Sequence, residues 1–116
     1  MMNKTRTIMI IVSDVPLNEE TKKRIVDNYK NNTGVDISIV GGKLFYDPKI
    51  VIGTINNNKN TRFIISYIEI DGSGNATLKT IDEPKLVKRL IKELKKNKNG
   101  NSYEIIDKFY KSNILI

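Results

Sequence analysis

The residues best placed to do chemistry in this chain are cations that recur at a helical period near the C-terminus. From Pro84 onward the sequence reads PKLVKRLIKELKKNK, and a helix over residues 85–98 gathers its apolar side chains on one side. The opposite side carries a basic stripe, formed by Lys85, Lys88, Arg89, Lys92 and Lys96. Such a stripe can bind a phosphate backbone or an acidic protein, or it can simply be solvated, which is the commoner role of a lysine-rich helix face.

The positive charge is concentrated at one end of the chain. The net charge is +7; residues 1–82 carry 11 basic and 9 acidic side chains, whereas residues 83–116 carry 9 basic and 4 acidic ones. A bias toward isoleucine, lysine and asparagine indicates an AT-rich genome and explains part of the lysine excess. The localisation of the charge is therefore more informative than its total, and it indicates one basic surface.

Aromatic residues follow the basic stripe on the next predicted helix. Tyr103, Phe109 and Tyr110 could stack on bases if a nucleic acid tracked the stripe, or they could belong to the core. Tyr103 and Tyr110 are therefore candidate binding residues together with the five cations.

Two acidic patterns could bind a metal. Residues 71–75, Asp-Gly-Ser-Gly-Asn, begin like a calcium loop, but Ala76 stands where that loop needs glycine and no glutamate closes it. Glu69 and Asp71 lie two residues apart on a predicted strand, so they share a face and could hold a metal or divide acid and base roles. A hairpin with a polar edge explains both patterns better.

Several common catalytic chemistries lack their residues. The chain has no cysteine and no histidine, which removes the thiolate nucleophile, the usual zinc ligands and the usual base near neutral pH. Asp14 follows the first predicted strand, where open sheets often place catalytic groups, but a turn or capping role fits its neighbours better. Gly41-Gly42-Lys43 lacks the spacing of a phosphate-binding loop. We therefore expect no enzymatic activity, no metal site and no cofactor.

The hydrophobic pattern predicts the elements that position these residues. Residues 7–12 form a nearly continuous apolar run, typical of a central strand buried on both faces. Asn18 is a suitable N-cap for a helix that ends at Thr33-Gly34, and residues 35–39 alternate as a strand does.

The remaining pattern predicts grouped strands followed by helices. A Gly41-Gly42 hairpin turn leads to strands at residues 43–46, 50–55, 62–70 and 76–81, with an exposed loop at residues 56–60 and helices at residues 85–98 and 103–111. Because the strands are grouped, we expect an α+β fold, a single two-layer domain over residues 1–116. Its mainly antiparallel sheet would have about five or six strands, one N-terminal crossover helix and two C-terminal helices.

The start of the chain argues against membrane targeting. Lys4 and Arg6 precede an apolar run at residues 8–12, but a signal core needs roughly 7 to 15 apolar residues and a membrane span about 20. We expect a cytoplasmic protein without a membrane span.

One stretch resembles a known family. The run IIVSDVPLNEETKKRIVDNYKNNTGVDISI, residues 10–39, resembles the C-terminal domain of the ATP synthase delta subunit, where a strand leads through Pro-Leu and a Glu-Glu helix start to Thr-Gly and a second strand. Asp47-Pro48 before Ile50-Val51-Ile52-Gly53 is similar to that domain's Asp-Pro turn before Leu-Ile-Gly-Gly, and Ile81-Asp82 entering a basic helix is similar to its ending. The sequence departs from the family at Thr54, where a second glycine belongs, and across residues 56–80. The resemblance implies a non-catalytic connector with contacts near residues 47–53 and the last helices.

Two functional hypotheses follow. The first is a non-enzymatic protein-binding or assembly module, which the resemblance, the missing catalytic residues and the apolar end Ile114-Leu115-Ile116 support. The alternative is a small basic nucleic-acid-binding protein, such as a plasmid- or virus-borne regulator, whose basic helix contacts phosphates. No oligomeric state is favoured.

Overall fold

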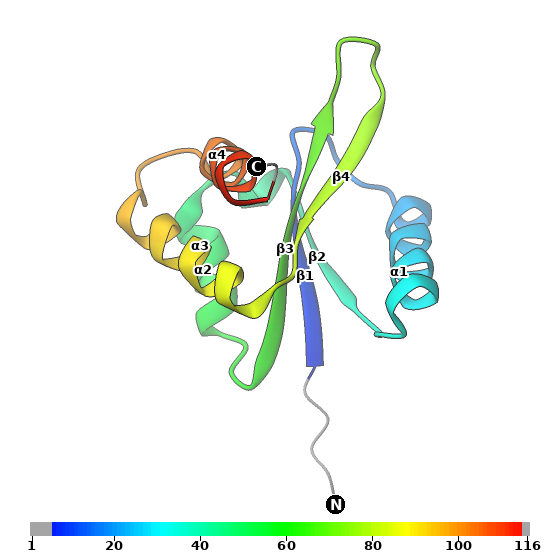
Figure 1. Ribbon diagram of the computed structural model, residues 1–116, viewed down its shortest axis with the longest axis horizontal. Coiled ribbons are helices and arrows are strands. Elements are labelled where there is room, and N and C mark those ends of the chain that lie inside the picture. The colour runs from blue at the N-terminus through cyan, green and yellow to red at the C-terminus, as the bar shows by residue number, and fades with distance from the viewer. Residues whose placement is uncertain (1–5, 115–116) are drawn as a thin grey trace, which may run out of the picture.

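The sheet is built around its most apolar strand. β1 (Arg6–Val12) lies between β2 (Ser38–Gly42) and β3 (Thr61–Ile70), and β4 (Ala76–Ile81) pairs with the other side of β3. The computed structural model describes residues 6–114, without the side chains of residues 42–44 (Figure 1). β1 is buried on both faces along most of its length, which confirms the prediction of a central strand.

The strand directions require helical crossovers. β1 runs parallel to both β2 and β3, whereas β3 and β4 are antiparallel. The first crossover contains α1 (Glu19–Thr33), and the second contains the short helix η1 (Lys43–Tyr46) and α2 (Pro48–Asn56). α3 (Pro84–Lys96) and α4 (Ser102–Asn113) end the chain on the same face as α2, opposite α1 (Figure 1). The result is a single α+β domain with three layers.

The side chains of β1 point alternately to the two faces of the sheet, so they contribute to a hydrophobic core on each side. Met9 and Ile11 pack with α1, whereas Ile8, Ile10 and Val12 pack with α2, α3 and α4. The larger core lies on the three-helix side, and it includes Tyr67, Val51, Val87, Leu90, Leu94, Ile106 and Phe109.

The caps of α1 confirm the predicted first helix. The Asn18 side chain accepts a hydrogen bond from the N–H of Thr21 at 2.7 Å. Gly34 takes the left-handed conformation with φ of 77° and donates its N–H to the carbonyl of Lys30. Both ends were therefore readable from the sequence.

The predicted sheet was wrong in its strand count, its pairing and its layers. Residues 50–55, expected as a strand, belong to α2, and residues 43–46 form η1 instead of a strand. The Asp47 carboxylate accepts a hydrogen bond from the N–H of Lys49 at 2.9 Å, and Pro48 occupies the first turn. Residues 6–114 contain four strands, in a mixed sheet, and α1 covers the face opposite the other helices, so the domain does not have two layers.

The predicted hairpin at Gly41-Gly42 was also wrong. β2 continues through these residues in parallel register with β1, with Gly41 opposite Ile11 and Gly42 opposite Val12. A Cβ atom at Gly41 would collide with the carbonyl oxygen of Ile11. Glycine is required here by the close approach of two strands and not by a turn.

The predicted hairpin between β3 and β4 is confirmed. The Asp71 carboxylate accepts hydrogen bonds from the backbone N–H groups of Ser73 and Asn75, both at 2.9 Å, and Gly74 has a φ of 84°. Backbone donors, with Asn75 contributing most, hold the pKa of the Asp71 carboxyl below its ordinary value. The carboxylate that opens the calcium-like sequence thus closes a turn.

Between residues 6 and 114, no helix is long and apolar enough to cross a membrane.

Candidate binding surface around the basic helix

The helix that carries the basic stripe is positioned by its cap and its apolar side. The Glu83 carboxylate accepts a hydrogen bond from the N–H of Lys85, and Pro84 fits the first turn. Val87, Leu90 and Leu94 are buried in the larger core, as the helical period predicts. The opposite side of α3 is therefore held toward solvent.

All five predicted cations of the basic stripe are exposed. They are Lys85, Lys88, Arg89, Lys92 and Lys96, and Lys95 is exposed beside them. The ion pairs of residues 6–114 involve cations outside α3, namely Lys22, Arg24, Lys30 and Lys111. Within the described part of the chain, then, no carboxylate lies within 4.0 Å of an α3 cation to neutralise it.

Two of the cations border a hollow between β3 and α3, which we call the β3–α3 hollow. Lys85 and Lys88 line it together with Arg62, and its volume is about 330 Å³. Its other lining residues are mainly apolar: Thr61, Phe63, Pro84, Val87 and Ile91. The structure thus adds Arg62, which the sequence analysis did not single out, to the basic surface.

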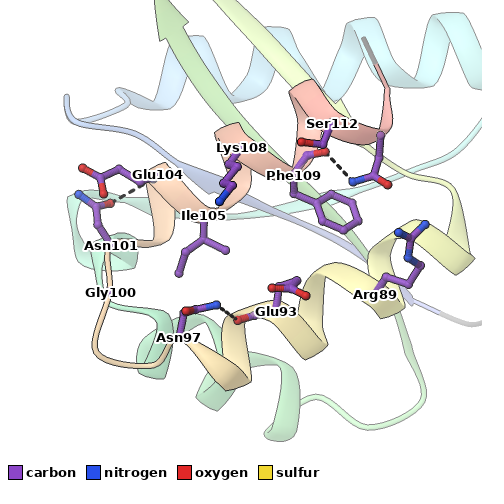
Figure 2. A pocket seen from close by; sticks show the side chains of 11 residues that line it. Arg89, Glu93, Asn97, Gly100, Asn101, Glu104, Ile105, Lys108, Phe109 and Ser112 are labelled. Atoms are coloured by element: carbon purple, nitrogen blue, oxygen red, sulfur yellow. Dashed lines mark hydrogen bonds between the residues drawn. The ribbon is translucent and has the colours of Figure 1, made fainter. Parts of the chain in front are cut away.

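Arg89 borders a different depression, the α3–α4 groove, of about 490 Å³ (Figure 2). Its guanidinium carbon lies 5.7 Å from the centroid of the Phe109 ring, a cation–π distance. Lys108 and Glu93 point into the groove from α4 and α3 (Figure 2). Because Glu104 also lines it, this groove presents charges of both signs, unlike the hollow on the other side of α3.

The two predicted tyrosines lie apart from the basic stripe. The rings of Tyr103 and Tyr110 pack edge to face on Tyr67 of β3, with centroid distances of 5.3 and 5.8 Å. Burial, followed by the charges of Asp107 and Glu69, raises the pKa of Tyr103. Neither tyrosine lines the hollow or the groove, so the structure does not bring them together with the stripe.

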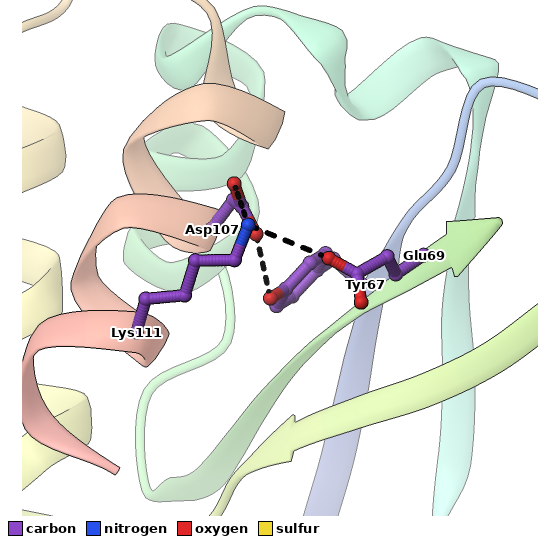
Figure 3. A network of polar contacts seen from close by, with 4 residues as sticks. All are labelled: Tyr67, Glu69, Asp107 and Lys111. Atoms are coloured by element: carbon purple, nitrogen blue, oxygen red, sulfur yellow. Dashed lines mark hydrogen bonds and ion pairs between the residues drawn. The ribbon is translucent and has the colours of Figure 1, made fainter. Parts of the chain in front are cut away.

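A polar network connects α4 to β3 at the carboxyl end of the sheet (Figure 3). The buried Tyr67 hydroxyl donates to Oδ1 of Asp107 at 2.8 Å, and Lys111 Nζ lies 3.2 Å from Asp107 Oδ2 and 3.6 Å from Glu69 Oε2. Burial, followed by the hydrogen bond to Asp107, raises the pKa of Tyr67 well above its ordinary value, and Asp107 raises the pKa of Lys111. The network fixes α4 on the sheet.

This network was not predicted from the sequence. Asp107 and Lys111 stand four residues apart on a predicted helix, a spacing that could have indicated their ion pair. Tyr67 lies 40 residues before Asp107 in an apolar strand, and nothing local indicates that contact.

The carboxyl end of β1 forms a turn. Ser13 is buried, and its hydroxyl donates to the carbonyl of Val15 and accepts from the N–H of the same residue. Asp14 is exposed after it, and its charge makes a smaller contribution to the raised pKa of Tyr103. Among residues 6–114, no three acidic side chains are grouped closely enough to hold a metal ion.

Comparisons of the chain with protein-family models, with curated proteins and with solved structures found no match. A function must therefore be inferred from the surface around α3.

Proposed function

We propose that this protein is a non-enzymatic protein-binding module that uses α3 to bind an acidic protein partner. The observation that carries the proposal is the set of exposed α3 cations, without a carboxylate partner among the described residues, beside an apolar hollow. Unpaired cations next to exposed apolar surface complement a partner that offers carboxylates together with an apolar side chain.

The energetics of α3 support a use for its charge. Lys88 stands four residues before Lys92, which stands four before Lys96, and Lys85 stands four before Arg89. Each like-charge pair at this spacing destabilises an isolated helix by about 0.2–0.5 kcal/mol. The buried leucines compensate for this repulsion, and an acidic partner would remove it.

A nucleic acid is the second candidate, because the same exposed cations could contact phosphates. Base stacking on Tyr103 or Tyr110 would require that ring to leave its edge-to-face contact with Tyr67. Phe63 of the β3–α3 hollow is an aromatic side chain beside Lys85 and Lys88, but it is only partly exposed because it packs with the larger core. The shortage of exposed rings along the stripe favours the protein partner.

The resemblance to the ATP synthase delta C-terminal domain supports the same class of function, since it implies a non-catalytic connector. The strand, helix and strand of the resembling stretch correspond to β1, α1 and β2.

At the other end of the chain, Ile114 packs against the larger core, and Leu115 and Ile116 of the predicted apolar end lie outside the described residues. We place the module in the cytoplasm as part of this proposal.

A pair of matched variants tests the proposal. The stripe variant replaces Lys88, Arg89, Lys92 and Lys96 with glutamine, which keeps helix propensity nearly constant. The control variant replaces Arg6, Lys23, Lys49 and Lys59 with glutamine, so it loses the same number of arginines and lysines from exposed positions outside α3.

Each protein is immobilised and exposed to nuclease-treated host lysate, and captured proteins are identified by mass spectrometry. The parent and the control variant should retain the same acidic proteins, and the stripe variant should not. Equal capture by all three proteins, or acidic proteins captured only from a parallel lysate without nuclease treatment, would contradict the proposal.

A further inference from the structure

One edge of the sheet loses its strand partner beside the β3–α3 hollow. β4 ends at Ile81, opposite Ile65, whereas β3 also includes residues 61–64, which pair with β1 on their other side. Within the described chain, residues 61–64 have no strand partner on the β4 side. An unpaired edge offers backbone N–H and carbonyl groups to an incoming chain.

Cations flank this edge on both faces of the sheet. Phe63 packs with the larger core, so alternation along β3 directs Arg62 toward the α1 face. There Arg62 Nη2 lies 3.5 Å from the carbonyl oxygen of Asp82. Lys85 and Lys88 stand on α3, at the opposite face. A strand placed at this edge would thus have a cation on each of its sides, although the Asp82 carboxylate, which accepts a hydrogen bond from the Tyr29 hydroxyl, also lies on the α1 face.

The space next to the edge is apolar. Phe63, Val87 and Ile91 line it, and none of the carboxylates in the described part of the chain does. All three side chains also contribute to the larger core, so the surface they form is fixed by the fold. A volume of about 330 Å³ accommodates an aliphatic side chain.

From these features we infer that the β3–α3 hollow binds an extended acidic segment of the partner protein, which adds a short strand beside residues 61–64. The inference rests on the proposed function and names the form of the partner. The main chain of the segment bonds to the free edge of β3, and one apolar side chain enters the hollow above Phe63. Its carboxylates meet Lys85 and Lys88 on one face and Arg62 on the other.

An extended segment fits this site better than a helix does. Successive side chains of a strand alternate between faces, which matches cations placed on both faces of the edge. A helix would leave the backbone groups of residues 61–64 unpaired, and it would direct its side chains to α3 alone.

The probe for this inference is a fluorescein-labelled decapeptide made of two Glu-Glu-Val-Glu-Glu repeats. In each repeat an extended chain carries valine between two glutamates on one face and glutamates alone on the other. The peptide is titrated by fluorescence anisotropy at low and at physiological salt. The parent should bind it, and the same peptide with lysine in place of every glutamate should not bind. Replacing Lys85 and Lys88 together with glutamine should weaken binding about tenfold, as should Arg62→Gln, because each removes charge-assisted hydrogen bonds. The control Lys23→Gln with Lys49→Gln should change affinity by less than about twofold, as expected of distant exposed charges.

A second arm needs no protein variant. N-methylation of alternate peptide amides removes the donors and the space that strand addition requires, so binding should be lost. The amide hydrogens of residues 61–64 should also exchange more slowly with the unmodified peptide bound.

Absence of parental binding, or binding that N-methylation leaves unchanged, would overturn the inference. Binding lost in the stripe variant but unaffected by Arg62→Gln and by N-methylation would overturn strand addition and leave the proposed function in place. Failure of the proposed function itself is recognised separately, as equal capture from lysate by the stripe and control variants.

Discussion

Replacing Tyr67 with phenylalanine should lower the free energy of unfolding by about 1.5–2 kcal/mol, near the lower end for a hydrogen bond to a charged group. The substitution deletes the 2.8 Å bond to Asp107 and keeps the ring that contacts Tyr103 and Tyr110. The lower end applies because Asp107 keeps Lys111 as a partner and its side chain is 26% exposed, so water can replace the lost donor. The melting temperature should fall by about 4 °C for each kcal/mol in a domain of this size.

Urea denaturation of Tyr67→Phe, Asp107→Ala and the double variant measures the coupling of the two side chains. The coupling energy should be about 1.5 kcal/mol, the size expected of residues in direct contact. A Tyr67→Phe variant within about 0.5 kcal/mol of the parent would refute the structural role that we assign to this bond.

The alkaline limb of the stability profile gives an independent check on the same residue. Because burial raises the pKa of Tyr67, its hydroxyl stays neutral in the folded protein. In the unfolded chain the same hydroxyl ionises once the pH exceeds its ordinary pKa. The stabilisation is thus complete at neutral pH and is lost as pH rises, by about 1.4 kcal/mol per pH unit for one such group. Above pH 10 the phenylalanine variant should lose stability less steeply than the parent. The difference in tyrosinate absorbance between the two proteins, which reports Tyr67, should appear only as the parent unfolds.

Three further substitutions test the fold by urea denaturation. Leu90→Ala should cost about 2–5 kcal/mol because it opens a cavity at the fully buried centre of α3, and a smaller loss would mean that α3 packs loosely. Gly41→Ala should destabilise by at least about 1–3 kcal/mol, since its Cβ collides with the Ile11 carbonyl; a neutral effect would argue against the parallel pairing of β1 and β2. Asp47→Ala should cost about 1 kcal/mol through loss of the α2 N-cap, and unchanged stability would argue against this helix start.

Signals confined to a few neighbouring residues were readable from the sequence. The Asn18 cap, the Gly34 stop, the hairpin at residues 71–75 and the apolar side of α3 all depend on local chemistry, and all four are present. Residues 50–55 were wrongly predicted as a strand because their β-branched side chains favour one. The preceding Asp47-Pro48 is a helix start, and these residues belong to α2.

Parallel pairing could not be read in the same way. The contact between β1 and β3 joins residues about 55 positions apart, such as Ile10 and Ile65, and no local pattern encodes it. The candidate surface depends instead on the antiparallel β3–β4 pairing, which sets Ile65 opposite Ile81 and so brings the start of β3, with Arg62, near the start of α3. The sequence therefore indicated the cations of the helix and this hairpin, but not the packing of α3 beside β3 that forms the hollow.

The most direct test of the central claim, that α3 binds an acidic protein, is lysine footprinting of the complex. The protein is acetylated with and without its captured partner, and the modified lysines are quantified by mass spectrometry. Our account predicts protection of Lys85, Lys88, Lys92 and Lys96, with Lys23, Lys49 and Lys59 modified equally in both states. Protection of the second group, or equal modification of all seven lysines, would contradict it.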